Sequence, residues 1–363
     1  MMRKPAICLA ICVIFAVIGC GNAAITTKSK PAETFGAWPN PTGNPIGGGK
    51  GYHQIVSRSH FKVSTAQGLL AALKKAGKGQ VVYVDDGAEI DLTGKQKIVI
   101  PGGVILASGR GNAKGGKVSK GALLFTKQQN ASPLFQVGGP GVRITGLRIR
   151  GPDPERRTAL LQGLHKQGKY YTIPTSDGIQ SKHPNLEVDN CEVSAWGHAA
   201  IYLMKGAANA HVHHNYIHHN QRSGLGYGVS INQATALIEG NLFDFCRHAI
   251  AGTGRPGEVY EARYNIYMAH ANGHIFDMHG GGDRGDGTNI AGTRINIHHN
   301  TVINTDWPAA IIRGRPQQPS EIHHNWFIHI KEPWANKQNI GWCVMQLGGE
   351  GNLKVYKNHY GPK

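Results

Sequence analysis

Apolar residues flank an asparagine in the same arrangement at several points along the chain. With the asparagine as position zero, apolar residues stand at −3 and +2, as in Val212-Asn215-Ile217, Ile238-Asn241-Phe243, Ile297-Asn300-Val302 and Ile322-Asn325-Phe327. The arrangement is looser in Ala262-Asn265-Tyr267 and Val355-Asn358, and has another residue at zero in Val188-Cys191-Val193 and Ile144-Leu147-Ile149. Most steps between zero positions are 24 to 26 residues, and three are longer.

This repeat predicts an all-β fold, a right-handed parallel β-helix of about ten coils. Short strands of period two would place one rung of each coil in each of three sheets. Asparagines at equivalent turns would stack as an amide ladder and satisfy backbone groups at the bend. The alternative solenoid is a leucine-rich repeat, but its leucine spacing is absent.

A helix is expected before the coils. Ser64-Thr65-Ala66-Gln67 resembles a capping box and opens the amphipathic stretch STAQGLLAALKKAG, which predicts a helix over residues 64–76 that covers the exposed first coil. The order LLAALKKAGKGQVVYV, IDLTG and IVIPGGVILASGRG, followed by repeated coils, resembles the pectate-lyase-like superfamily of parallel β-helix proteins over residues 51–363. The resemblance implies the fold. The arginine-proline-arginine signature of pectate lyases is missing, and Arg313-Gly314-Arg315-Pro316 is the nearest stretch.

The N-terminus predicts export. Arg3 and Lys4 precede an apolar run, and Val17-Ile18-Gly19-Cys20 resembles a bacterial lipobox, so residues 1–19 are interpreted as a lipoprotein signal with lipid on Cys20. A plain signal peptide cut near Ala23-Ala24 is the alternative. Residues 20–50, rich in Pro, Gly, Thr and Lys, are expected to be a flexible tether. The predicted location is the bacterial cell envelope, on the outer membrane or the periplasmic face, with membrane contact only through the lipid.

The composition limits the classes of binding partner that are expected. The 363 residues carry a formal net charge of +17 with 7% aromatics. Such a charge favours polyanions, but dispersed basic residues and few aromatics argue against nucleic acid. An acidic polysaccharide is the expected partner, and the chain is expected to be a monomer. Beyond Cys20 only Cys191, Cys246 and Cys343 remain, so no disulfide framework is expected.

The triplet HHN occurs four times, twice within HVHHNYIHHN at 213–215 and 218–220, and again at 298–300 and 323–325. Imidazole is a common metal ligand, so a metal site is one interpretation. The repeat favours the other, in which the triplets are scaffold. By alternation, the first histidines (His213, His298 and His323) should face solvent, and the second (His214, His299 and His324) should lie beside the ladder.

The repeat also indicates where a functional site could lie. Counting forward from each zero position, offsets of +7 to +14 contain many polar residues, and neighbouring rungs lie about 4.8 Å apart. This strip supplies the predicted catalytic residues His279, Arg313, Arg255, His248, Tyr227 and Asp277. It also supplies the predicted substrate-binding residues Lys205, His198, Arg222 and Trp307, and Arg315, also predicted to bind substrate, directly follows its last position. A solvated face without function is the alternative. Insertions at residues 151–174 and 280–292 are the expected walls of the groove.

A basic strip with histidine and tyrosine suits β-elimination on a uronate polymer, so the chain is predicted to be a polysaccharide lyase. Arg255 and Arg313 would neutralise the uronate carboxylate, His279 or His248 would take the C5 proton, and Tyr227 would donate one to the leaving oxygen. Asp277 would orient a histidine.

Two other functions stay open. Ser176-Asp177-Gly178-Ile179 and the residues from Gly197-His198 resemble motifs of polygalacturonases, but the paired aspartates expected between them are replaced by Asp189-Asn190-Cys191. A β-helix that only binds polysaccharide is the third possibility. No cofactor is expected. Asp283 and Asp286 are candidate calcium ligands, although a Gly-Asp loop without metal is the favoured interpretation.

Overall fold

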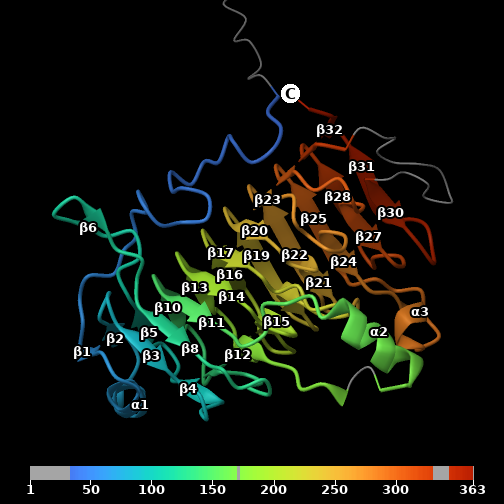
Figure 1. Cartoon of the computed structure of the whole chain (residues 1–363). Coiled ribbons are helices and arrows are strands. Elements are labelled where there is room, and N and C mark those ends of the chain that lie inside the picture. The colour runs from blue at the N-terminus through green and yellow to red at the C-terminus, as the bar shows by residue number, and fades with distance from the viewer. Residues whose placement is uncertain (1–32, 170–171, 330–342, 363) are drawn as a thin grey trace, which may run out of the picture. The chain divides into compact units, whose positions relative to one another are not determined.

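The computed structural model describes residues 33–169, 172–329 and 343–362. From Thr34 onward the chain forms one compact unit. Its strands stack coil upon coil in three parallel sheets, which are named sheets A, B and C here (Figure 1). Every pairing within the three sheets joins strands of successive coils in parallel, as in β16 with β19 and β17 with β20. The chain is a right-handed parallel β-helix, as the repeat predicts.

The strands occur in the same order in each coil, A, then B, then C. Sheet A contains β1 Phe61–Val63, β2 Val81–Val84, β5 Ile105–Ala107, β10 Arg143–Thr145, β13 Glu187–Asp189, β16 Ala210–His213, β19 Thr235–Glu239, β22 Val259–Arg263, β25 Arg294–His298, β28 Ser320–His323 and β31 Leu353–Tyr356. Sheet B contains β3 Glu89–Asp91, β8 Leu123–Phe125, β11 Arg148–Arg150, β14 Glu192–Ser194, β17 Tyr216–His218, β20 Leu242–Asp244, β23 Ile266–Tyr267, β26 Thr301–Val302, β29 Trp326–Phe327 and β32 His359–Tyr360. Sheet C contains β4 Ile98–Ile100, β9 Phe135–Val137, β12 Asp177–Ser181, β15 Ala199–Leu203, β18 Tyr227–Ile231, β21 His248–Gly252, β24 Phe276–Met278, β27 Ala310–Ile312 and β30 Val344–Gln346.

The interior consists of apolar columns. In sheet A the residues at −3 stack in register, as Val212 on Ile238, and in sheet B the residues at +2 do the same, as Ile217 on Phe243. All four are at least 98% buried. Stacking like on like lets each coil cover the apolar face of its neighbour, which a single coil cannot do alone.

The predicted asparagine ladder is present between sheets A and B. The Oδ1 atom of Asn241 accepts a hydrogen bond from the backbone N–H of Asn215 at 2.9 Å, and that of Asn265 accepts one from the N–H of Asn241 at 2.9 Å. The ladder continues through Asn300 and Asn325. The residue before each zero position has a positive φ, such as 52° at His214, 63° at Gly240 and 53° at His299. The left-handed turn is consistent with asparagine, glycine or histidine before most zero positions, although Tyr264 and Lys357 adopt it before Asn265 and Asn358.

The predicted capping helix is α1 (Ala66–Lys75). The hydroxyl of Thr65 accepts a hydrogen bond from the backbone N–H of Gly68 and closes the first turn. Leu69 and Leu73 are buried against the first coil, where the helix covers the open end of the solenoid. The other elements are α2 (Thr158–Lys166), α3 (Gly281–Arg284) and a hairpin of β6 (Ala113–Lys114) and β7 (Lys117–Val118).

Residues 34–54 form an N-terminal strap over the turns between sheets A and B. The N–H of Gly36 donates to the carbonyl of His324, that of Gly47 donates to the carbonyl of Gly240, and that of Gly49 donates to Oδ1 of Asn190. The prediction of a flexible tether is therefore wrong for residues 34–50. Its backbone N–H groups donate to carbonyl and amide oxygens of the turns, a role that composition does not reveal.

The lipoprotein signal, Cys20 and the start of the tether lie outside the described residues and stay predictions. No helix in the described part of the chain is long and apolar enough to cross a membrane. Cys191, Cys246 and Cys343 are buried and free. Among the described cysteines the structure therefore agrees with the expectation that no disulfide framework forms.

Candidate functional site

A groove of about 290 Å³ lies on the outer face of sheet C. Its floor comes from β15, β18 and β21, and its rim from the turns that follow them. It is lined by His198, Tyr202, Leu225, Tyr227, Ser230, Asn232, Ala251, Gly252, Thr253, Arg255, His279 and Arg284. Four residues of the predicted strip therefore meet here: His198, Tyr227, Arg255 and His279. Of the two insertions, the second reaches the groove, through Arg284.

His198 forms a pair with an aspartate of the preceding coil. Its Nδ1 lies 2.5 Å from Oδ1 of Asp177, whose side chain is almost fully buried. The other carboxylate oxygen of Asp177 accepts a hydrogen bond from the hydroxyl of Ser132. Because a carboxylate accepts, Nδ1 carries the proton and Nε2 offers a lone pair in the neutral ring. The rings of Tyr202 and Tyr227 form T-shaped contacts with this ring, with centroids 5.0 and 5.4 Å away.

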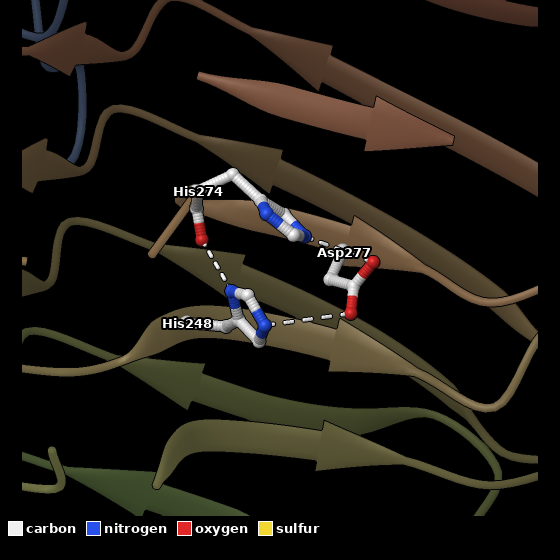
Figure 2. A group of neighbouring side chains, drawn as sticks. All are labelled: His248, His274 and Asp277. Carbon is white, nitrogen blue, oxygen red and sulfur yellow. Dashed lines mark hydrogen bonds and ion pairs between the residues drawn. The ribbon is translucent and has the colours of Figure 1, made fainter. Parts of the chain in front are cut away.

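Asp277 is the polar centre beneath the groove. Its Oδ1 lies 3.0 Å from Nε2 of His274 and 3.0 Å from Nε of Arg313, and its Oδ2 lies 3.1 Å from Nε2 of His279 (Figure 2 draws the pair with His274). Nε2 of His248 is 3.5 Å from the same Oδ2. Burial raises the pKa of Asp277, but its contacts with His274 and His279 outweigh burial and hold the pKa well below the usual value. Asp277 is therefore an anion that organises its four neighbours.

The second insertion supplies a rim of carboxylates and cations. Asp283 of α3 contacts Nδ1 of His279 at 3.4 Å and Nη1 of Arg313 at 3.5 Å. Asp286 accepts hydrogen bonds from Arg284 and from the backbone and hydroxyl of Thr288. Both carboxylates of the candidate calcium pair are therefore engaged with protein donors.

The structure separates the other predicted site residues from the groove. Arg222 is 1% exposed and its guanidinium donates to the carbonyls of Pro174 and Ile173, so the prediction that it binds substrate is wrong. His248 is also 1% exposed, which rules it out as a base that touches substrate. Lys205 and Arg315 are exposed outside the groove, and Trp307 borders a different pocket of about 470 Å³ near α2.

The turn from sheet B to sheet C varies in length, so a fixed offset from the asparagine does not locate equivalent residues in sheet C. Tyr202, Ser230, Ala251, Asp277 and Ile311 stack in register in sheet C. They follow their zero positions at distances between ten and fifteen residues, because the turn from sheet B to sheet C changes length from coil to coil. A fixed offset therefore missed Tyr202. It also missed His274, which only its position three residues before Asp277 would have indicated.

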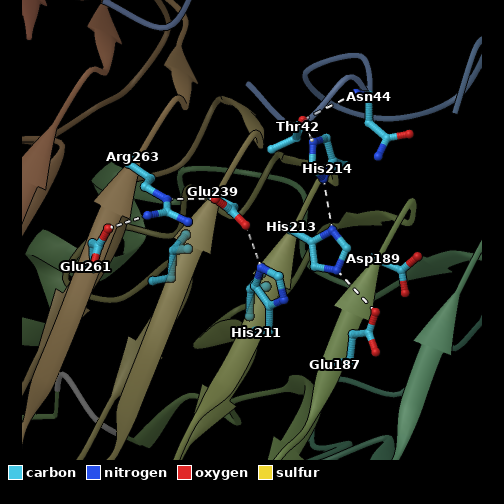
Figure 3. Close-up of polar contacts among 12 residues, drawn as sticks. Thr42, Asn44, Glu187, Asp189, His211, His213, His214, Glu239, Glu261 and Arg263 are labelled. Carbon is cyan, nitrogen blue, oxygen red and sulfur yellow. Dashed lines mark hydrogen bonds and ion pairs between the residues drawn. The ribbon is translucent and has the colours of Figure 1, made fainter. Parts of the chain in front are cut away.

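None of the HHN triplets lines the groove. The triplets that end at Asn215, Asn300 and Asn325 lie where strands of sheet A end, and the one at 218–220 lies at the end of β17 in sheet B. His213 is 4% exposed, so the prediction that it faces solvent is wrong. Its Nδ1 lies 2.9 Å from Nδ1 of His214, whose Nε2 is in turn 2.8 Å from the hydroxyl of Thr42 in the strap (Figure 3). The strap thus covers the first triplet. In the later triplets His298 and His323 stay partly exposed and stack on each other, with parallel rings 5.0 Å apart.

Ion pairs join the histidines of sheet A across successive coils. Glu239 accepts hydrogen bonds from Nε2 of His211 at 2.8 Å and from Nε of Arg263 at 2.7 Å (Figure 3). Arg263 also donates to Glu261, which contacts His298. Burial raises the pKa of Glu239, but the bonds with His211 and Arg263 outweigh it and lower the pKa to about 2. These contacts support the scaffold interpretation of the triplets.

Comparisons with known proteins give likeness of fold. No protein-family model matches the chain, and a search of curated proteins finds no match. Among solved structures, an alginate lyase from Paenibacillus sp. str. FPU-7 aligns at 14% identity and a TM-score of 0.49, over 83% of this chain and 99% of that one. A family 28 exopolygalacturonase from Yersinia enterocolitica aligns at 11% and 0.49, over 81% of this chain and 62% of that one.

A third structure is the A-module of the mannuronan C-5 epimerase AlgE6 from Azotobacter vinelandii, at 11% identity and a TM-score of 0.41, over 82% of this chain and 95% of that module. The parallel β-helix expected from the sequence is confirmed by the three parallel sheets of this chain, and no single family is identified. The names of these proteins do not transfer an activity to this chain, whose own groove carries the functional argument.

Proposed function

We propose that the chain is a lyase that cleaves an acidic, uronate-containing polysaccharide by β-elimination. In this reaction a base takes the proton from C5 of the uronate, a double bond forms between C4 and C5, and the bond from C4 to the glycosidic oxygen breaks. The leaving oxygen gains a proton. The groove on sheet C provides a base, a proton donor and cations within one lined surface.

The observation that carries the proposal is the pair of His198 and Asp177. The carboxylate holds the ring in one tautomer and orientation, and it stabilises the imidazolium that forms when Nε2 takes a proton. His279, the base predicted from sequence, suits this role less well, because carboxylates contact both of its ring nitrogens. The proposal therefore assigns proton abstraction to His198.

Cations at the other end of the groove would neutralise the uronate carboxylate. Arg255 is exposed and lines the groove beside His279. Neutralising the carboxylate matters because the transition state gains negative charge at C5, next to the acid group. Arg313 is bound to Asp277 and Asp283, which makes it a positioning residue rather than the fork predicted from sequence. Tyr227, whose ring packs on that of His198, is the proposed proton donor.

A hydrolase is less well supported by the groove. Glycoside hydrolysis needs two carboxyl groups that flank the scissile bond. Among the described residues that line the groove there is no aspartate or glutamate. Asp177 and Asp277 lie behind histidines and are at most 2% exposed.

The test is a substrate panel of alginate, pectate, glucuronan, hyaluronan, chondroitin and heparin, incubated with purified protein. A lyase produces an unsaturated product with ultraviolet absorbance, whereas a hydrolase produces reducing ends without that absorbance. Binding without either product would indicate a polysaccharide-binding protein. The unsaturated product supports the proposal, and each of the other outcomes contradicts it.

Substitutions test whether a measured activity depends on the groove. His198→Ala and Arg255→Ala should each lower kcat/KM by roughly 10² to 10³, a loss of about 3 to 4 kcal/mol of transition-state stabilisation. His323→Gln, on the outer face of sheet A, is the matched control and should retain activity within a few-fold. Equal losses in the control and in His198→Ala would show that the groove is not the site.

A further inference from the structure

His248, His274 and Asp277 bring three potential ligand atoms together below the groove (Figure 2). One ring nitrogen of each histidine and a carboxylate oxygen of Asp277 all lie within 4.8 Å of one another. The residues come from β21, from the start of the next rung and from β24, so rigid strands hold two of them. They are 1%, 6% and 0% exposed, which removes water as the default partner for their polar atoms.

The backbone fixes the tautomer of His248. Its Nδ1 lies 2.6 Å from the carbonyl oxygen of His274, and a carbonyl only accepts, so Nδ1 carries the proton. In the neutral ring Nε2 therefore has a lone pair, and it faces Oδ2 of Asp277 at 3.5 Å. Two electron-rich atoms then face each other in a buried place, which is unfavourable unless a cation lies between them.

The hydrogen-bond pattern also leaves both Nε2 atoms without a partner. Neither Nε2 of His248 nor that of His274 makes a hydrogen bond within the described part of the chain. Nε2 of His274 lies 3.0 Å from a carboxylate oxygen of Asp277, a contact that is an ion pair when the ring is protonated and that leaves the neutral ring without a hydrogen bond at Nε2. Buried polar atoms without a partner are rare in folded proteins, so two of them on one cluster indicate a missing ligand.

We propose that His248, His274 and Asp277 bind a divalent transition metal, for which zinc is the best match. Imidazole and carboxylate are zinc ligands, and bonds of about 2.0–2.1 Å place tetrahedral ligand atoms roughly 3.3 Å apart, close to the spacing here. Calcium is a poorer match because it prefers oxygen ligands. The hydrogen bond from Nδ1 of His248 to a backbone carbonyl is the outer-shell contact typical of metal-binding histidines. Three protein ligands leave a fourth position open.

The charges near the site fit a dication. Arg313 shares the carboxylate of Asp277, but Asp283 contacts both Arg313 and His279 and brings a second negative charge. The other candidate cluster, Glu187, Asp189 and His213, is less suitable. Both oxygens of Asp189 there already accept hydrogen bonds, Oδ1 from Arg143 and Oδ2 from Arg143, Tyr52 and Thr145.

The proposal is independent of the proposed lyase activity, so its test needs no substrate. The full chain, expressed without a histidine tag, is stripped with a chelator and titrated with Co²⁺ while visible absorption is recorded. We expect one equivalent to bind with the strong absorption of a tetrahedral site, and Zn²⁺ to displace it. Zn²⁺ should also raise the melting temperature, because a ligand that binds the native state stabilises it.

Substitutions of the proposed ligands test where the metal binds. His274→Ala and Asp277→Asn should lower affinity by at least the ~10- to 100-fold loss that follows removal of an outer partner of a ligand. His211→Asn/His213→Asn, which alters the histidines of sheet A, is the control and should keep the full equivalent. Melting curves check folding, and Asp277→Asn preserves the shape of the side chain where His274→Ala fails to fold. Absence of stoichiometric binding by folded protein, or loss of binding in the control alone, would overturn the proposal.

Discussion

Nδ1 of His198 lies 2.5 Å from Oδ1 of Asp177, and the two residues belong to successive coils of the β-helix. The strand register creates this pair, because β12 and β15 place Asp177 beside Ala199, the residue after His198. The aspartate is buried and the histidine lines the groove, so one side of the ring is fixed while the other faces the space where a substrate would lie.

The first prediction concerns this pair. Asp177→Asn keeps the shape of the side chain but removes the charge that stabilises an imidazolium, so kcat should fall by roughly 10² to 10⁴. Steady-state kinetics on the active polysaccharide measures the loss. The matched control is Asp244→Asn, because Asp244 contacts the exposed His270 at 3.0 Å on sheet B, away from the groove. The assignment of His198 as the base fails if both variants lose activity equally.

The second prediction concerns the asparagine ladder. Asn241 is fully buried, accepts from Asn215 and donates to Asn265 and to the carbonyl of Val212, so Asn241→Ala leaves several buried polar groups without partners. The free energy of unfolding should fall by about 2 to 4 kcal/mol. Asn358→Ala, at the partly exposed end of the ladder, should cost about half as much or less, because water can replace its bonds. Urea unfolding compares the two, and equal losses would argue against a cooperative ladder.

The third prediction concerns the stability of the fold at acidic pH. Burial, followed by the charges of neighbouring histidines, lowers the pKa of His299 from 6.5 to about 4. The unfolded chain therefore binds a proton at this residue below pH 6.5, whereas the folded chain does not until about pH 4. The free energy of unfolding should decrease as pH falls through this window. His299→Asn removes this contribution and keeps a residue that tolerates the positive φ. Unfolding curves at several pH values should show a shallower slope for the variant, and an unchanged slope contradicts the prediction.

The fourth prediction concerns the strap. Gly48 has a φ of +66°, and a Cβ there would lie 2.3 Å from the carbonyl oxygen of His214 and 2.6 Å from Oδ1 of Asn190. Gly48→Ala should therefore displace the strap as well as strain the backbone. Gly43→Ala, at a φ of +71° with open space around it, should show only the strain, about 1 to 2 kcal/mol. Hydrogen exchange should rise along residues 34–54 in Gly48→Ala and stay low in Gly43→Ala.

The repeat made the fold predictable. Apolar residues at −3 and +2 around Asn215, Asn241 and Asn300 mark two of the three strands of a coil, and the ladder requires the turn between them. The turn before sheet C has no such marker. Its length depends on loop residues such as those from Gln221 to Gly226, so the register that pairs Tyr227 with His248 could not be counted from the asparagine.

The site was predictable only as a region. His198, Tyr227, Arg255 and His279 were on the strip, but their roles depend on partners in other coils, such as Asp177 for His198. Burial excludes Arg222 as a substrate-binding residue. No local pattern in the sequence reveals that its guanidinium donates to the carbonyl of Pro174. The strap was missed for a related reason, because its contacts follow the turns rather than any period of its own.

The strap gives this solenoid an unusual order of assembly. During synthesis residues 34–54 emerge before any coil exists, yet the N–H of Ala37 donates to the hydroxyl of Thr301, 264 positions later. A repeat protein otherwise grows by adding each coil to its neighbour, with mostly local contacts. Here residues 34–54 are synthesised before the coils, but they cannot complete their docking until the coil that contains Thr301 has formed. This contact therefore reports that the coil of Thr301 has formed, since a nascent chain that stops before Thr301 cannot make it however well its earlier coils have folded.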